Sequence, residues 1–201
     1  MTRMGRVAGF LTVSVVVFAG GVSRAEPPEG WFGGGDGYDR GRDAAVKRGG
    51  ESSGSLFSTG DEAKAFGTLL QSFKADKFKG KRLKLSAYVK SEDVERWSGL
   101  WMRIDGKDKT SLAFDNMMGR PIKGTTDWKK YEIVLDLPDD SAEIYFGLLL
   151  AGKGKVWIDD VTFEIVGKDV ATTGLEIQSA DRQNPLAPDL PDEPKNLDFE
   201  K

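Results

Sequence analysis

The feature that most constrains this chain is a two-residue alternation of apolar and polar side chains. Between residues 81 and 90, every second residue is apolar, namely Leu83, Leu85, Ala87 and Val89. Residues 99–105 repeat the pattern, with Trp101 and Arg103 opposite the apolar set of Leu100, Met102 and Ile104. Successive side chains of a strand point to opposite faces, so this period predicts half-buried β-strands.

The same pattern extends over most of the chain in short segments. Strands are predicted at 55–59, 66–75, 81–90, 99–105, 110–115, 128–137, 143–150 and 155–166. Turn-forming residues separate them, as in the hairpin signal Asp105-Gly106-Lys107-Asp108. No sustained helical period accompanies these segments. The chain is therefore predicted to be all-β, with an antiparallel β-sandwich over residues 26–166.

The amino-terminal 25 residues have the features of a signal peptide. Arg3 and Arg6 precede an apolar stretch over residues 7–22, and Ala25 ends a small-residue cleavage pattern. The stretch is too short to predict a membrane anchor. We expect a periplasmic or secreted protein without stable membrane insertion.

The carboxyl-terminal part differs from the sandwich in composition. Residues 167–195 are polar and contain several prolines, which predicts an extended tether. Residues 196–201 are strand-like again, because Leu197 and Phe199 alternate with Asp198 and Glu200. We predict that this end returns to the sandwich as a strand. The alternatives are a frayed tail and pairing with a second molecule.

Composition excludes several classes of function. The chain has no Cys and no His, so it cannot carry a disulfide framework, a Ser-His-Asp triad or a His- or Cys-ligated zinc site. Its net charge is −3 and it has no basic stripe. Nucleic acid is therefore not expected as the main ligand.

Two features of the sequence are compatible with an enzyme. Gly50-Glu51-Ser52-Ser53-Gly54 matches the nucleophile elbow of hydrolases, but the histidine base of that mechanism does not exist here. Paired carboxylates could hydrolyse glycosides without histidine, and Glu92, Asp93 and Glu95 or the pair Asp159-Asp160 are nominal candidates. Acids at strand ends more often cap turns, so we expect no catalytic activity.

Trp101 and Arg103 are the first candidates for a ligand site. They share the polar face of one predicted strand, where an indole beside a guanidinium could stack on a sugar ring and bind its hydroxyls. Trp97 precedes them, and Asp115 and Asn116 end the next strand. The alternative is a packing pair in which Trp101 covers Arg103 and its neighbours.

Two further places are candidates for binding. Trp31 and Tyr38 flank a glycine cluster at residues 33–37, in a loop that is either pinned to the body or open to a ligand. Asp159 and Asp160 interrupt an apolar strand, which predicts either a β-bulge with a hydrogen-bonded turn or a cation site. Ca²⁺ is one of the few metals that such oxygen ligands hold well.

Several segments together resemble a known group. They are Gly80–Leu83, Ser98–Asp105, Phe114–Met117, Arg120–Ile122, Gly124-Thr125, Asp127-Trp128 with Tyr131, and Val156–Asp160. In layout the chain resembles bacterial jelly-roll domains of the galactose-binding-like class, which are similar to carbohydrate-binding modules and to accessory domains of exported enzymes.

The resemblance has further implications. It covers residues 31–166 and adds Arg120 to the ligand-binding candidates. Such domains begin with an Asn-x-x-Phe-Glu strand that here stands at the far end, in residues 196–200. The resemblance implies that Glu200 joins Asp159 or Asp160 at a structural Ca²⁺.

The sequence thus predicts an exported, non-catalytic jelly-roll module. Its expected partner is a glycan or a related polyhydroxy ligand. One alternative is a structural or protein-interaction module that uses the same face against a partner protein. The other alternative is a carboxylate glycoside hydrolase.

Overall fold

A computed structural model describes residues 26–60, 65–174 and 190–201, so the predicted signal peptide lies outside the described residues. The described residues form nine strands and no helix. These residues therefore contain no helix that could span a membrane. The strands are β1 (Phe32–Gly34), β2 (Tyr38–Asp43), β3 (Ser53–Ser58), β4 (Gly67–Lys74), β5 (Arg82–Gly106), β6 (Ser111–Asp115), β7 (Ile122–Asp136), β8 (Ser141–Ala151) and β9 (Lys155–Val166).

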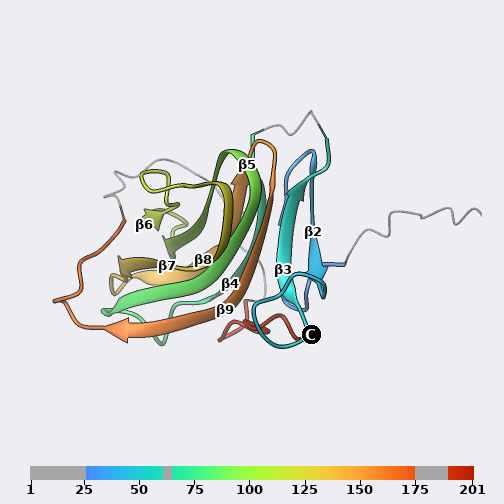
Figure 1. Cartoon of the computed structure of the whole chain (residues 1–201). Coiled ribbons are helices and arrows are strands. Elements are labelled where there is room, and N and C mark those ends of the chain that lie inside the picture. Colours follow the sequence, from blue (N-terminus) through green and yellow to red (C-terminus); the bar gives the residue numbers. More distant parts are fainter. Residues whose placement is uncertain (1–25, 61–64, 175–189) are drawn as a thin grey trace, which may run out of the picture.

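The long strand β5 belongs to both halves of the sandwich (Figure 1). Its first part, residues 82–92, pairs with β9 on one side and β7 on the other. Its second part, residues 97–106, pairs with β8 and, near its end, with β6. We call β2, β3, β9, β7 and the first part of β5 the β9 sheet. The β8 sheet consists of β1, β4, β8, β6 and the second part of β5.

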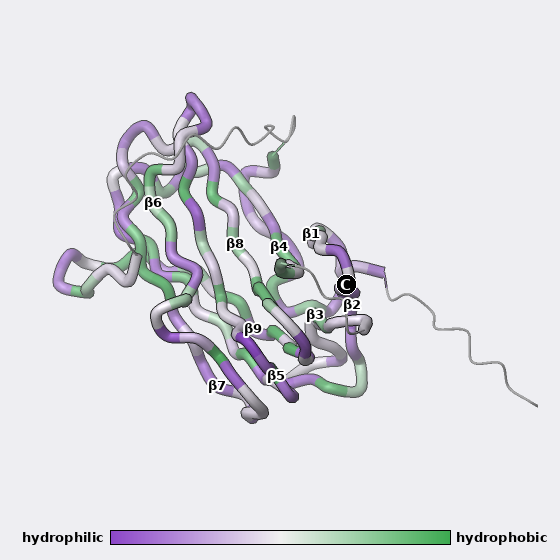
Figure 2. Tube along the Cα trace, turned by 90° about the horizontal axis from the view of Figure 1, so that it is seen from above, coloured by the Kyte–Doolittle hydropathy of each residue, from purple (hydrophilic) through white to green (hydrophobic). Residues whose placement is uncertain are grey.

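The core lies between these two sheets, and the pairings within them are antiparallel. Strands β3 and β4 contact each other across the interior although they are not hydrogen-bonded neighbours. Phe73 and Phe146 are fully buried, with ring centroids 5.8 Å apart in an edge-to-face contact. Figure 2 shows the apolar and polar residues alternating along several strands. The predicted antiparallel β-sandwich is therefore confirmed.

Several strands differ from the sequence prediction, which contained neither β1 nor β2. Residues 81–90 and 99–105 were expected as separate strands, but both lie in the single strand β5. The residues between these two segments still pair with β7, although the register shifts several times between Val89 and Ser98. The strand is therefore irregular here but continuous. The same pairing makes β7 begin at Ile122, ahead of the strand predicted at 128–137.

Strand β9 contains the irregularity that Asp159-Asp160 suggested. Tyr88 of β5 pairs with Asp159, whereas Ser86 pairs with Thr162, so β9 has an extra residue at this point. Asp160 has a φ of +49°, a left-handed conformation that this short polar residue tolerates. The two adjacent acids thus lie at a β-bulge.

The carboxyl-terminal segment, residues 196–201, lies against the body beside β9 and the loop between β2 and β3 (Figure 1). Phe199 is fully buried and stacks on Trp31 with ring centroids 4.7 Å apart. The predicted strand is wrong, because the segment forms a turn. Asn196 and Phe199 both have positive φ, and the Asn196 side chain bonds both the N–H and the carbonyl of Lys201, which curls the chain.

Candidate functional site

The β8 sheet carries a second apolar cluster on its outer face, away from the core. Its buried members are Trp101, Tyr145, Leu149 and Ala151, with exposed fractions of 9%, 8%, 7% and 3%. Leu70, Trp97 and Phe114 are partly buried and pack against them. We call these seven residues the outer cluster. It arises from alternation, because residues 100, 102 and 104 of β5 face the core and residues 97 and 101 pack on the other side.

The Trp101 side chain extends across the sheet from β5 to β4, past a glycine on the strand between them. Trp101 of β5 pairs with Gly147 of β8, and Gly147 pairs with Leu70 of β4. The indole Nε1 donates a 3.0 Å hydrogen bond to Oγ1 of Thr68 on β4, two strands away. A side chain at Gly147 would collide with the backbone of β4, since an added Cβ would lie 2.1 Å from the carbonyl oxygen of Leu69.

This geometry corrects the prediction for Trp101. Its ring is nearly buried and hydrogen-bonded, so it forms part of the floor of the outer face and is not an open stacking platform. The more exposed rings of the cluster belong to Trp97 and Phe114, both half-buried. Trp97 lies opposite Ala151, whose small side chain leaves the neighbouring indole partly uncovered.

A polar group adjoins the outer cluster. Arg103 shares its face with Trp101 and donates bidentate hydrogen bonds of 2.7–3.0 Å to Asp105. Its guanidinium also lies 4.6 Å from the ring centroid of Tyr145, a cation–π distance. The Tyr145 hydroxyl donates a 2.6 Å hydrogen bond to Glu143. Burial and the nearby Glu143 raise the pKa of Tyr145, so this hydroxyl keeps its proton.

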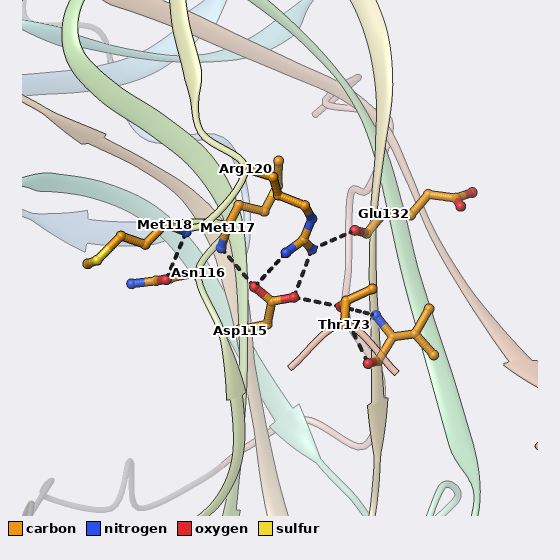
Figure 3. Close-up of polar contacts among 8 residues, drawn as sticks. Asp115, Asn116, Met117, Met118, Arg120, Glu132 and Thr173 are labelled. Atoms are coloured by element: carbon orange, nitrogen blue, oxygen red, sulfur yellow. Dashed lines mark hydrogen bonds and ion pairs between the residues drawn. The ribbon is translucent and has the colours of Figure 1, made fainter. Parts of the chain in front are cut away.

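Asp115, Asn116 and Arg120 do not reach this face, and Figure 3 shows the polar contacts that they make instead. Asp115 pairs with Met102, whose side chain is in the core, so Asp115 lies on the side away from Trp101 and Arg103. Its carboxylate accepts hydrogen bonds from the Met117 N–H, Arg120 and the Thr173 hydroxyl at 2.6–3.1 Å. The Asn116 side chain caps the Met118 N–H at 3.1 Å. These residues form a structural clasp that fixes the segment after β9.

Trp31 and Tyr38 are placed in the core. They are 4% and 3% exposed, and the Trp31 indole donates to the carbonyl of Asn196 at 3.0 Å. The Tyr38 hydroxyl bonds both the N–H and the carbonyl of Gly152 at 2.9 and 3.2 Å. The loop between them is therefore pinned by its aromatics, and neither ring faces a ligand. The sequence could not distinguish a pinned loop from one that is open to a ligand, because both have aromatic residues beside a glycine cluster.

Asp159, Asp160 and Glu200 converge on the loop between β2 and β3. Asp159 accepts hydrogen bonds from the N–H groups of Arg48 and Gly49, and Asp160 forms an ion pair with Arg48. Glu200 accepts from the N–H of Glu51 at 2.9 Å with both oxygens. Within the described ranges, no three acidic side chains are grouped closely enough to hold a metal ion. Calcium binding at these acids stays a prediction.

The carboxylates weighed for catalysis are engaged at the surface. Glu92 pairs with Lys155 at 2.9 Å, and Asp93 accepts the hydroxyl of Thr125 at 3.0 Å. Tyr145 and Glu143 were not among the site residues predicted from the sequence. The signal was present in residues 143–151, where Glu143, Tyr145, Gly147 and Leu149 occupy alternate positions and must share one face.

No family model matches the chain. The chain is 44% identical over 165 residues to the uncharacterized HTH-type transcriptional regulator YbfP of Bacillus subtilis (strain 168). The match covers 82% of this chain but 53% of that protein, so the chain spans about half the length of its relative. A helix-turn-helix motif needs two helices, and the residues described here contain none. The match therefore carries no inference of DNA binding by these residues.

Solved structures share the fold at low identity. The xylan-binding domain CBM22-1 from Paenibacillus barcinonensis Xyn10C has a TM-score of 0.51 and 15% identity, with coverage of 71% of this chain and 90% of that domain. Its tandem with CBM22-2 scores 0.53 at 14% identity and coverages of 68% and 42%. A Stig cyclase from Fischerella sp. TAU, bound to an indole compound, scores 0.50 at 14% identity and coverages of 71% and 87%.

These likenesses establish the fold and leave the chemistry open. The predicted resemblance to jelly-roll domains of the galactose-binding-like class is confirmed, because carbohydrate-binding modules are among the structural neighbours. The presence of a cyclase among them shows that the same architecture serves both binding and catalysis. Function must therefore be inferred from the outer face of the β8 sheet.

Proposed function

We propose that the protein is a non-catalytic glycan-binding module and that it binds its ligand on the outer face of the β8 sheet. The observation that carries the proposal is the outer cluster itself. A sandwich of this kind needs one apolar core, between its two sheets. This chain has a second apolar cluster on the outer face of the β8 sheet, whereas the outer face of the β9 sheet carries charged residues. Its partly exposed members Leu70, Trp97 and Phe114 give this face an apolar surface outside the core, which is typical of a binding site.

The chemistry of the face suits a sugar. Carbon-bound hydrogens on one side of a sugar ring are apolar and stack on aromatic rings, and the half-buried Trp97 and Phe114 provide such rings. Arg103, Tyr145 and Glu143 are close enough to bind ring hydroxyls. Trp101 supports the site as its floor, while Trp97 takes the stacking role that sequence gave to Trp101. The xylan-binding neighbour supports this assignment by its fold alone.

Export remains part of the proposal. Residues 1–25 have the pattern of a cleaved signal peptide, and most glycans that such modules meet lie outside the cytoplasm. Amino-terminal sequencing of the protein from fractionated cells should find a start near Glu26. Recovery of a chain that begins at Met1 or Thr2 would contradict export without affecting the binding face.

Affinity electrophoresis in gels that contain soluble xylan, glucan or galactan tests the binding proposal. The chain should be retarded by at least one of these polysaccharides. Trp97→Ala should weaken that binding about tenfold or more, since loss of a contact aromatic typically costs 1–3 kcal/mol. Trp128→Ala is the matched control, because Trp128 is also half-buried but lies on β7 in the β9 sheet.

The same gels decide between the proposal and its main alternative. Equal retardation of the parent and Trp97→Ala on every polysaccharide, or no retardation at all, would remove the glycan assignment. The outer cluster would then be left for a protein partner. The exposed Phe32 beside Leu70 at the edge of this face is the feature that favours that alternative.

A further inference from the structure

The outer face of the β8 sheet changes from apolar to polar along its strands. Between Trp97 and Asp105 the pairing of β5 with β8 has no register shift, and the pairings of β8 with β4 and of β4 with β1 have none. Directly opposed residues share a face, so these registers define rows that cross the outer face. The three apolar rows are Trp97–Ala151, Gly99–Leu149–Thr68–Gly34 and Trp101–Gly147–Leu70–Phe32. The two polar rows that follow are Arg103–Tyr145–Ser72 and Asp105–Glu143–Lys74.

The apolar rows offer a sugar little hydrogen bonding. Thr68 carries their only hydroxyl, which donates to the Leu148 carbonyl and accepts from the Trp101 indole, both at 3.0 Å. Sugar hydroxyls placed over Leu149 and Leu70 would lose their bonds to water without replacement, which is costly. These aliphatic side chains also lack the ring face on which a sugar stacks. This part of the face therefore favours an apolar group as its ligand.

The surface beside β1 leaves room for such a group. Gly34 shares the outer face with Thr68, and a Cβ added at Gly34 would meet nothing within 4 Å. Phe32 is 46% exposed on the same face, directly opposite Leu70. Leu70 in turn packs against the outer cluster. Apolar surface thus continues from the outer cluster to the edge of the sheet.

We propose that the glycan bound on this face carries an apolar acyl, alkyl or aryl group, which lies on Leu149, Leu70 and Phe32. The inference rests on the proposed glycan-binding function and names its ligand class as amphipathic glycosides. The sugar follows β5 and β6, where Trp97 and Phe114 provide rings, and the apolar group covers β8, β4 and β1. Burial of the apolar group removes its surface and that of the protein from water, which favours binding. The exposed Phe32 is then accounted for without a protein partner.

Isothermal titration with three glycosides of one disaccharide tests this inference. The probes are methyl, hexyl and phenyl β-cellobioside, at concentrations where the hexyl compound forms no micelles. The protein should bind the hexyl or the phenyl glycoside about tenfold or more tightly than the methyl glycoside, because burial of apolar groups adds to the affinity. The stronger of the two tells whether the substituent is aliphatic or aromatic. Hexan-1-ol is the control without a sugar and should bind more weakly than hexyl cellobioside.

Two variants assign the preference to the β1 side of the face. Phe32→Ala should lower the ratio between the preferred and the methyl glycoside about fivefold, because an exposed contact ring is lost. Ile165→Ala is the matched control, since Ile165 is 50% exposed but lies on β9 in the other sheet. It should keep the preference of the parent. Thermal melts establish that both variants are folded.

The outcomes separate this inference from the proposed function. Equal affinity of the parent for the three glycosides, or no binding of any, would overturn the apolar substituent. A preference that Phe32→Ala leaves unchanged would also overturn it, as would hexan-1-ol binding as tight as that of hexyl cellobioside. In each case, retardation by a polysaccharide that Trp97→Ala weakens would leave the glycan-binding function standing. Failure of both the titration and the gels would overturn both.

Discussion

The two outer faces of the sandwich differ although one strand, β5, contributes to both. In its first part the outward residues are Arg82, Lys84, Tyr88 and Lys90. They form ion pairs such as Lys84–Glu164 at 2.6 Å and Lys90–Asp127 at 2.9 Å. In its second part the outward residues are Trp97, Trp101, Arg103 and Asp105. The core side carries mainly apolar residues in both parts, such as Leu83 and Leu85 in the first and Leu100 and Met102 in the second, so folding alone does not explain the change.

The difference indicates which outer face has a use beyond folding. A sheet face that only meets water can carry long charged side chains, whose surface ion pairs contribute little stability. A face that leaves aromatic rings such as Trp97 and Phe114 partly exposed favours unwanted association unless the surface has a use. The contrast between the outer faces therefore supports the proposed placement of the binding site on the β8 sheet. Variants in the core and on each outer face can measure how far the two faces differ in their contribution to stability.

The largest loss of unfolding free energy is expected for a substitution in the core. Phe199→Ala removes a fully buried ring that stacks on Trp31 and rests on Gly54. The free energy of unfolding should fall by about 3–5 kcal/mol, because a large cavity remains. Urea unfolding followed by circular dichroism measures it. A loss below about 1 kcal/mol would mean that the carboxyl-terminal segment does not belong to the folded core.

Trp101→Ala should lower the free energy of unfolding almost as much as a core substitution, although Trp101 lies outside the core. The indole is 9% exposed and bonds Thr68, so its removal should cost about 3 kcal/mol in unfolding free energy. Lys84→Ala, at the outer face of the other half of β5, is the comparison and should change it by less than about 1 kcal/mol. Equal effects of the two variants would erase the contrast between the faces.

Gly147→Ala tests why Trp101 can lie across β8. The added Cβ would meet the carbonyl oxygen of Leu69 at 2.1 Å, so strands β4 and β8 must separate. We expect a loss of about 1–3 kcal/mol and a change in the near-ultraviolet circular dichroism of the indole. Gly119→Ala is the control, since an added Cβ there meets nothing within 4 Å. Similar melting of both variants would show that β8 needs no glycine.

The charged face should respond to acid in a defined direction. Hydrogen bonds from Arg82, and more weakly from Lys168, hold the pKa of Asp136 well below its usual range against the opposing effect of burial. A depressed folded-state pKa stabilises the fold above the unfolded-state value of about 4, and this stability is lost as the pH falls below it.

Asp136→Asn should therefore lower the unfolding free energy at neutral pH and match the parent in acid. The Asp136 side chain is 42% exposed, so solvent screening limits the difference to about 1 kcal/mol. Urea unfolding of both proteins across the acidic range measures it. A difference that persists or grows in acid would contradict the assigned ion pair.

The smallest effect is expected at Lys90. Its partner Asp127 has an 85% exposed side chain, so Lys90→Ala should change the unfolding free energy by about 0.5 kcal/mol or less. High salt should remove even that difference, because it screens exposed charges. A salt-independent loss above about 1 kcal/mol would show that this outer face is also structurally demanding.

Much of the fold could be predicted because alternation is a local signal. The pattern in residues 81–90 and 99–105 identified the strands and placed Trp101 with Arg103 on one face. Continuity of β5 through residues 91–98 could not be predicted, since it depends on irregular pairing with β7. The carboxyl-terminal turn also escaped prediction, because positive φ at Asn196 and Phe199 is set by contacts with the body.

The site was predicted less well because it depends on register between strands. Trp101 packs in a cluster with Tyr145 and Leu149, which lie more than 40 positions away in sequence and come beside it only through the β5–β8 pairing. Asp115 was grouped with Trp101 by proximity in sequence, but the β5–β6 register puts it opposite Met102. Glu143 and Tyr145 were missed because no single strand shows that they adjoin Arg103.

The most direct test of the central claim maps ligand contacts onto the two outer faces. Amide chemical shifts of the isotopically labelled protein are recorded while a bound oligosaccharide is titrated. We predict perturbations on one sheet, in residues 68–72 of β4, 97–105 of β5 and 143–151 of β8, together with the indole N–H of Trp97. Perturbations concentrated on β3, β9 and the first part of β5 would contradict the account, because they would place the ligand on the charged face.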